Sequence, residues 1–197
     1  MKFNRLPLDF FRRDTTIIAQ ELLGKLFVRI IDKQTISAEI IETEAYLPNN
    51  DPACHAAKRK TPRNSPMFED GGILYVYFIY GNHFCANIVT EKKGFGSAVL
   101  IRAACPIDGI EIMKLNRNRR KIEDLCSGPG KFAQAFGLTR EHNNHSLISQ
   151  DIFLAEYNYY KDKEITTTTR IGIREGSNLP LRFYVNNSEI LKFISKK

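Results

Sequence analysis

Two runs of aromatic and β-branched residues near the middle of the chain predict a β-hairpin. Residues 73–80 and 83–89 flank the pair Gly81-Asn82, and such a pair is typical of a two-residue hairpin loop. Gly81 can adopt a positive φ without a Cβ clash, as this turn requires. Tyr80, a large aromatic residue at the expected tip, either packs on a neighbouring loop or serves as a wedge.

A two-residue loop would fix the pairing of the two strands. Tyr80 then lies opposite His83, and Val76 lies opposite Asn87. This register places Asn87 and Tyr77 on opposite faces of the hairpin. If both side chains line one pocket, the hairpin must contain a bulge or twist sharply.

Other apolar segments predict further strands and short helices. Asp14 is the expected N-cap of a helix over 15–23, which Gly24 would end. No internal repeat or linker is apparent, so a single domain over residues 1–197 is expected. Further strands are expected over 26–32, 37–46, 97–103, 152–155, 165–173 and 181–185.

The expected strand over 37–46 carries an unusual set of polar residues. In a regular strand Glu42, Glu44 and Tyr46 lie on one face. Two carboxylates and a tyrosine are not typical of a core, and a solvated strand face is the alternative interpretation. Glu44 stands out because it lies at the strand end, directly before a long polar loop.

That loop, residues 47–70, exceeds the roughly 12–15 residues beyond which an irregular loop is usually functional or disordered. It contains His55, which alone would be unremarkable. Its basic residues suit contacts with phosphates, although a solvated loop is equally compatible with them. These residues are Lys58, Arg59, Lys60 and Arg63.

Arg102 interrupts the apolar strand over 97–103. A guanidinium in such a strand needs a carboxylate or phosphate partner, or it must reach solvent.

A glycine-rich segment, residues 126–131, precedes a short helix over 132–136. Ser127 is the expected N-cap, and an exposed helix start with Lys131 suits an anion. The segment is not a Walker motif, because Phe132 stands where Ser or Thr would bind magnesium. A DNA-backbone contact through Lys131 is preferred over a plain capped helix.

Composition adds a basic character to an otherwise ordinary globular chain. The net charge is +7, which favours a polyanionic partner without identifying it. No apolar run approaches the length of a membrane span, and the N-terminus does not resemble a signal peptide. A cytoplasmic or nucleoid location is expected. The four cysteines are widely spaced, which favours reduced, buried thiols over a zinc cluster.

The unusual side chains suit a pocket for a planar base: Glu44, Tyr46, His55, Tyr77, Tyr80, Asn87 and Arg102. Several motifs then resemble the alkyladenine (3-methyladenine) DNA glycosylase family. They follow the family's order over nearly the whole chain. The motifs are Glu42–Tyr46, Thr61–Asn64, Leu74–Gly81, Cys126–Pro129 and Pro180–Val185.

The resemblance implies an α/β fold of the α+β type, a single compact domain around a curved, largely antiparallel sheet with flanking helices and a protruding hairpin. It implies a monomer that acts on duplex DNA containing damaged purines and hydrolyses the N-glycosidic bond. No metal or organic cofactor is expected.

The resemblance also implies roles for individual residues. Glu44 matches the general base that activates water, and Arg102 matches the residue that helps to hold this water. The remaining matches concern the extruded base: Tyr46 stacks on one face, His55 and Tyr77 on the other, Asn87 disfavours guanine, and Tyr80 fills the gap left in the duplex.

Two alternatives remain. One is a non-catalytic nucleic-acid-binding module on the same fold, which would not need a carboxylate facing a polyanion. The other is a bifunctional glycosylase/lyase that uses an amine. Lys58 and Lys60 lie in a suitable loop, but no lysine is expected among the pocket residues.

Overall fold

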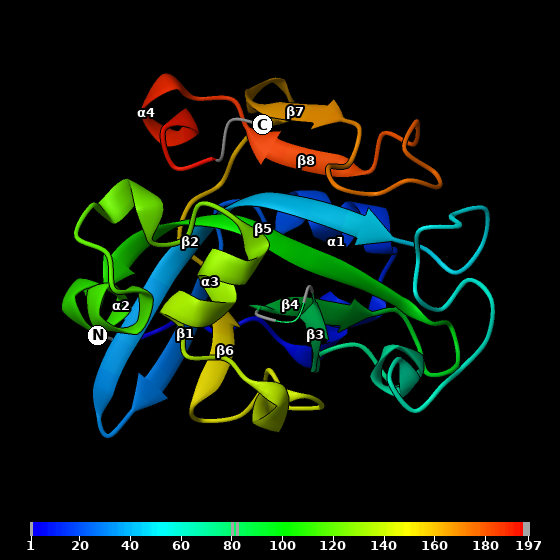
Figure 1. Ribbon diagram of the computed structural model, residues 1–197, viewed down its shortest axis with the longest axis horizontal. Coiled ribbons are helices and arrows are strands. Elements are labelled where there is room, and N and C mark those ends of the chain that lie inside the picture. Colours follow the sequence, from blue (N-terminus) through cyan, green and yellow to red (C-terminus); the bar gives the residue numbers. More distant parts are fainter. Residues whose placement is uncertain (1, 80, 82, 195–197) are drawn as a thin grey trace.

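The long strand β2 (Gln34–Tyr46) is the centre of the sheet in the computed structural model, which describes residues 2–79, 81 and 83–194. The first half of β2 pairs with β1 (Leu26–Ile31), and residues 42–44 of β2 pair with β8 (Arg182–Val185). On its other edge, β5 (Ser97–Asp108) follows β2 along most of its length. Figure 1 shows these two long strands crossing the molecule side by side.

The rest of the sheet extends from this centre. Beyond β5 lie β4 (His83–Thr90) and β3 (Leu74–Ile79), and beyond β1 lies β6 (Ile152–Ala155), while β7 (Ile165–Thr168) pairs with β8. All of these pairings are antiparallel. The sheet curls into a half-barrel.

Short helices flank the sheet. The described residues contain four α helices: α1 (Thr15–Glu21), α2 (Ile110–Arg117), α3 (Pro129–Ala135) and α4 (Ser188–Leu191). They also contain 3-10 turns at Leu8–Arg12, Ser65–Phe68, Ile122–Asp124, Arg140–His142 and Asp162–Glu164. The expected fold class is confirmed: a single compact domain of the α+β type around a curved, largely antiparallel sheet.

Helix α1 covers the apolar face of the central strands. Its start is capped as expected, because the Asp14 carboxylate accepts hydrogen bonds from the amides of Thr16 and Ile17. Thr43, which points away from the neighbouring Glu44 on β2, donates to the Ala19 carbonyl at 2.7 Å. In Figure 1, α1 lies behind the sheet and α3 in front of it. The Glu44 side of the sheet therefore faces away from α1.

The register of the β3–β4 hairpin differs from the expected one. Ile79 pairs with His83, which leaves three residues between the paired positions instead of two. Tyr77 consequently lies opposite Cys85, and Tyr75 lies opposite Asn87. Because directly opposed residues share a face, the Tyr77 and Asn87 side chains lie on the same side without a bulge. The expectation of a two-residue loop was wrong, and the conflict that it created disappears.

The start of α3 also differs from the expected arrangement. Gly128, not Ser127, is the N-cap residue, and Pro129 begins the helix. The Ser127 hydroxyl instead accepts a hydrogen bond from Lys131 Nζ at 2.9 Å. The amine of Lys131 is thus folded back over the start of its own helix.

Candidate active site

One face of the sheet assembles the expected site residues from four neighbouring strands. Tyr77 on β3 lies opposite Cys85 on β4, and Asn87 further along β4 lies opposite Leu100 on β5. Leu100 in turn lies opposite Glu44 on β2. Strand pairing alone therefore brings together side chains that are far apart in the sequence.

A cavity of about 560 Å³ opens over this face. Its volume lies in the range of small-molecule sites. A second cavity of about 20 Å³, with room for one water molecule, shares Tyr46, His55 and Tyr77 with the first and is also lined by Asn87. The large cavity is lined by residues that include Tyr46, His55, Tyr77, Cys85, Arg102 and Lys131.

Glu44 is completely buried, with 0% of its surface exposed. Its Oε1 accepts the Ile171 amide at 2.9 Å and lies 3.1 Å from Arg102 Nη1, while its Oε2 accepts the Tyr46 hydroxyl at 2.8 Å. The interpretation of Glu44 as part of a solvated strand face is wrong. A carboxylate has about four lone-pair sites, so these three donors leave one site without a partner among the described residues.

Arg102 reaches Glu44 because the β2–β5 ladder shifts its register at this point. Thr43 pairs with Ile101, but Glu42 pairs with Ala103, so Arg102 is the extra residue of a bulge. Burial lowers the pKa of Arg102, but the charges of Glu44 and Glu42 outweigh this effect and raise it above its ordinary value. The guanidinium is cationic, and of the alternatives of a carboxylate, a phosphate or solvent, the structure shows carboxylate partners.

Glu42 links two arginines next to Glu44. Its Oε1 lies 3.3 Å from Arg102 Nε and 2.8 Å from Arg182 Nη1. Only 2% of Glu42 is exposed, and a buried carboxylate is tolerated only when it is paired. Arg182 belongs to the Pro180–Val185 motif, but sequence reasoning assigned it no role.

Aromatic rings form the walls of the cavity. His55 and Tyr77 meet edge to face with ring centroids 4.7 Å apart, and His55 Nδ1 lies 3.0 Å from the Tyr75 hydroxyl. His55 is exposed as a residue, but partial desolvation of its ring, with a smaller contribution from Arg63, lowers the pKa of His55, which favours the neutral imidazole at pH 7. Burial and the neighbouring Glu44 raise the pKa of Tyr46, so its hydroxyl keeps the proton that it donates.

Asn87 lines the small cavity and is 4% exposed. Its Nδ2 donates to the Tyr75 carbonyl at 3.0 Å. This bond ties the amide to the neighbouring strand and fixes its orientation. Asn87 and Tyr77 therefore line the same site, as the resemblance requires.

Asn64, which sequence reasoning did not single out by itself, organises the basic loop. It is buried, and its Nδ2 donates to the carbonyls of His55 at 2.7 Å and Arg59 at 2.9 Å. Its Oδ1 accepts the Thr61 amide at 2.6 Å. The Thr61–Asn64 motif thus holds the segment that carries His55.

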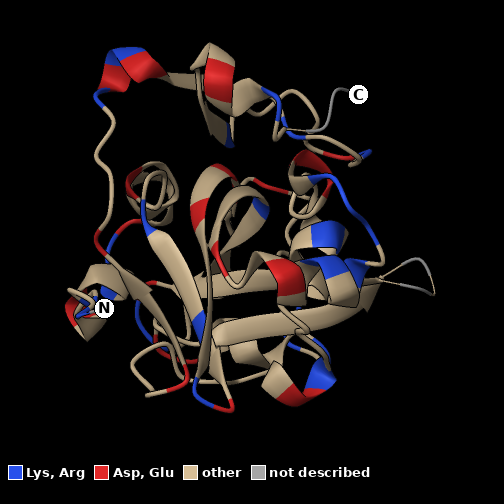
Figure 2. Cartoon of the chain, turned by 90° about the vertical axis from the view of Figure 1, so that its left-hand side faces the viewer, with Lys and Arg blue, Asp and Glu red and all other residues tan. Residues whose placement is uncertain are grey.

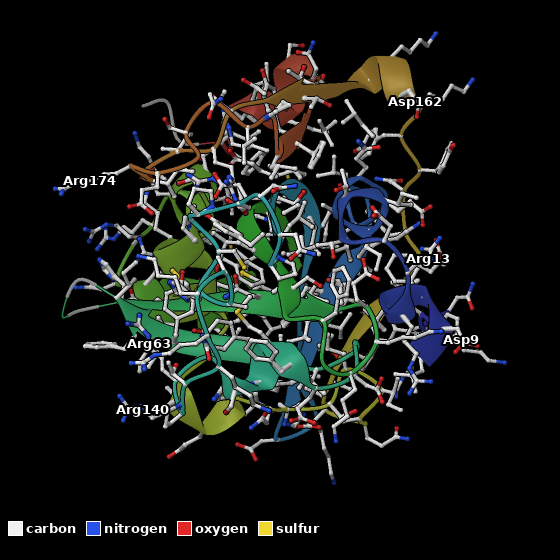
Figure 3. All side chains as sticks on the ribbon, turned by 90° about the vertical axis from the view of Figure 1, so that its right-hand side faces the viewer. Asp9, Arg13, Arg63, Arg140, Asp162 and Arg174 are labelled. Atoms are coloured by element: carbon white, nitrogen blue, oxygen red, sulfur yellow. The ribbon has the colours of Figure 1, made fainter. Side chains whose placement is uncertain are left out.

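The four basic residues of this loop differ in their surroundings. Lys58 and Arg59 are exposed. Lys60 Nζ lies 3.6 Å from Glu69 Oε1, and the Arg63 guanidinium lies 5.3 Å from the centroid of the Tyr77 ring. In Figure 3, Arg63 lies on the side toward which the hairpin runs, opposite the side that carries Asp9 and Asp162.

Lys131, Arg117 and Arg119 line the cavity on the side of α3. Lys131 thus belongs to the lining of the large cavity, whereas the described residues that line the small cavity beside Asn87 include no lysine. Figure 2 shows basic segments of the chain close to the base of the hairpin. Arg117 and Arg119 were not expected in the pocket, because nothing in their spacing indicated a cavity.

Tyr80, the expected wedge, lies outside the described residues. Cys54, Cys85, Cys105 and Cys126 are free and buried, as expected. Across residues 2–79, 81 and 83–194, no group of three or more His, Cys, Asp or Glu side chains is arranged to hold a metal ion. Over the same residues, none of the helices combines the length and apolar character needed to cross a bilayer.

Comparisons with known proteins agree with the motifs. The sequence profile of the methylpurine-DNA glycosylase family matches residues 9–189. A relative from Prosthecochloris aestuarii is 44% identical over 93% of this chain and 89% of its own length. Relatives from Francisella tularensis (44% identical; 94% of this chain, 96% of the relative) and Carboxydothermus hydrogenoformans (43%; 98% and 99%) are similarly close.

Each of these relatives carries the provisional name 3-methyladenine DNA glycosylase. The family match covers nearly the whole chain and includes every expected site residue. The expected enzyme class, a hydrolase of N-glycosyl bonds, is thereby confirmed. The chain belongs to the methylpurine-DNA glycosylase family.

Proposed function

We propose that this chain, as one domain over residues 1–197, is a monofunctional DNA glycosylase that flips damaged purines out of duplex DNA and hydrolyses their N-glycosidic bond. The proposed substrates are alkylated purines, such as the 3-methyladenine in the names of its relatives, and also deaminated purines. Glu44 activates the water, and Arg102 helps to hold it. The reaction starts base excision repair.

The single observation that supports this function best is the completely buried carboxylate of Glu44, which is bonded to three residues that line the aromatic cavity, Tyr46, Arg102 and Ile171. A protein that only binds DNA gains nothing from a buried negative charge, which is costly to desolvate. A hydrolase needs such a group to accept a proton from water, and a positioned base is typically worth about 10²–10⁴ in rate. The free lone pair of Glu44 suits this role.

The aromatic walls suit a flipped base. Extruding a base from the duplex costs a few kcal/mol, and stacking on an aromatic side chain returns roughly 1–3 kcal/mol. Tyr46 supplies one stacking surface and His55 with Tyr77 the other. Asn87, whose orientation is fixed by the Tyr75 carbonyl, disfavours guanine by opposing its 2-amino group.

Tyr80 acts as the wedge that fills the vacated stack, as apolar side chains do in other minor-groove binders. Phosphates are bound by basic residues around the cavity, which are Lys58, Arg59, Lys60, Arg63 and Lys131. The protein works as a monomer without a cofactor, in the cytoplasm and on the nucleoid.

A base-release assay tests this function. Duplexes that carry 3-methyladenine, hypoxanthine or 1,N6-ethenoadenine should each be compared with an undamaged duplex. We expect release of at least one damaged base and none from undamaged DNA. Binding without release from any lesion would instead favour the non-catalytic module.

Lys131 gives the glycosylase/lyase alternative a specific candidate amine, because it lines the cavity. Its Nζ is hydrogen-bonded to the Ser127 hydroxyl, and the proposed reaction does not need it as a nucleophile. Borohydride treatment of the reaction should therefore trap no covalent protein–DNA adduct. An adduct that forms with the wild type and disappears in Lys131→Met would contradict monofunctional hydrolysis.

The affinity for DNA should depend steeply on salt, because each phosphate that a basic side chain neutralises releases counterions. Replacing the exposed pair Lys58 and Arg59 by Gln should reduce the slope of log K against log[salt] by about 0.9 for each lost contact. Lys163→Gln, next to Asp162 on the far side in Figure 3, is the control and should leave the slope unchanged. Equal slopes in all three proteins would mean that the loop charges are only solvated surface.

A further inference from the structure

A buried ion pair lies next to Tyr46 of the cavity wall, and neither of its two residues lines the cavity. Arg170 Nη1 and Nη2 lie 2.6 and 2.5 Å from the two carboxylate oxygens of Asp51. The side chains are 0% and 1% exposed. Arg170 Nε has no hydrogen-bond partner among the described residues. A buried ion pair often adds no net stability compared with apolar residues of the same size. The position of this pair beside the cavity wall therefore points to a role in the site.

The carboxylate of Asp51 holds the loop that follows β2. Its Oδ2 accepts the Leu47 amide at 3.1 Å, and its Oδ1 accepts the Ala53 amide at 3.2 Å. Ala53 and His55 both line the cavity. Asp51 therefore fixes the start of the segment that brings the His55 ring to the site.

The guanidinium of Arg170 holds the opposite aromatic wall. Its Nη1 donates to the Ala45 carbonyl at 3.0 Å, and its Cζ lies 4.6 Å from the centroid of the Tyr46 ring. Tyr46 lines both cavities, whereas Arg170 lines neither. The guanidinium thus stacks on the face of the ring that points away from the cavity, and the other face remains open to a base.

The backbone of the same residue leads to the reacting groups. Ile171, the next residue, lines the cavity and donates its amide to Glu44 Oε1 at 2.9 Å. Gly172 follows with a φ of +78°, a conformation that favours glycine. Arg170 therefore fixes the point from which the chain turns toward Glu44.

We propose that Arg170, held by Asp51, is a positioning residue for the reaction. It does not touch the substrate. It aligns the Tyr46 ring, the His55 segment and the Ile171 amide around the plane in which the base would lie. This inference rests on the proposed function, in which that plane receives the extruded base. A misplacement of about 1 Å far from the reacting atoms can cost about 10²-fold in rate. Correct alignment of these groups therefore offsets the cost of desolvating the ion pair.

The test uses Arg170→Lys and Asp51→Asn. Lysine keeps the positive charge but loses the planar fork and the stacking on Tyr46. Single-turnover release of the best lesion should be measured well below the melting temperature of each variant, together with the affinity for undamaged duplex. We expect a rate loss of about 10- to 100-fold in both variants, with affinity for undamaged DNA unchanged within about twofold.

A matched control removes another ion pair. Lys25 Nζ lies 2.6 Å from Glu156 Oε2, and the two side chains are 9% and 47% exposed. Neither residue lines the cavity above Glu44. Glu156→Gln should therefore lower stability at most, and its single-turnover rate should equal that of the wild type.

A second measurement does not depend on bond cleavage. In the Glu44→Gln background, a bound ethenoadenine duplex should become more accessible to quenching by acrylamide when Arg170→Lys is added. Wild-type rates and unchanged shielding in folded variants would overturn the proposal, as would an Arg170→Lys protein that does not fold, because the pair would then be a folding determinant. Absence of base release by the wild type would instead overturn the proposed function.

Discussion

Replacing Glu44 by glutamine should lower single-turnover base release by at least about 10²–10⁴-fold, the usual contribution of a positioned base. Gln preserves the shape of the side chain and can still accept from the Ile171 amide and Arg102, but it cannot take a proton from water. Binding to a lesion duplex should stay close to that of the wild type. Both quantities can be measured on one set of duplexes.

Glu42→Gln is a matched control on the same strand. Glu42 and Glu44 are both buried, and both contact Arg102. Only Glu44 also bonds to the Tyr46 hydroxyl and the Ile171 amide within the cavity wall. We expect Glu42→Gln to lose much less activity than Glu44→Gln. Comparable losses in the two variants would mean that charge balance around Arg102, and not proton abstraction by Glu44, explains the effect.

Residues at the ends of regular elements could be predicted from the sequence. Glu44 and Tyr46 were recognisable because polar side chains with a period of two are unusual at the end of an apolar strand. Asp14 was recognisable as a helix cap for a similar local reason. In both cases the information lies within a few residues, and the structure agrees with it.

The hairpin register could not be predicted in this way. A loop with Gly81 at a positive φ is compatible with either two or three residues between the paired strands, and the choice changes which face every side chain occupies. The observed pairing of Tyr75 with Asn87 depends on how β4 packs against β5. The bulge that brings Arg102 into contact with Glu44 likewise depends on pairing with a distant strand.

The residues that support the cavity wall could not be identified from their sequence neighbours either. Asp51 and Arg170 are 119 residues apart in the sequence, and each resembles an ordinary charged loop residue. Their pairing follows only from the way β2 and the segment before β8 come together. Asn64 was part of a recognised motif, but the motif gave no indication that its amide holds the His55 segment.

Tyr80 follows β3 in the sequence and lies outside the described residues. If Tyr80 fills the stack that the flipped base leaves, Tyr80→Ala should lower release of a well-paired lesion by about 5- to 150-fold, the equivalent of roughly 1–3 kcal/mol of stacking. A mispaired lesion is cheaper to extrude, so its release should suffer less. Chemistry on an already flipped base should hardly change, because a wedge does not touch the glycosidic bond.

Phe78→Ala is the matched control for this experiment. Phe78 is also an exposed aromatic residue of the hairpin, with its ring 5.0 Å from that of Phe84, but it is not the proposed wedge. Its loss should not distinguish paired from mispaired lesions. If Tyr80 were instead a core residue, Tyr80→Ala would cost about 3–5 kcal/mol of stability and reduce activity on all substrates alike. Thermal melts with single-turnover rates on paired and mispaired hypoxanthine separate these outcomes, since only a wedge leaves the melting temperature unchanged while the rate loss follows base pairing.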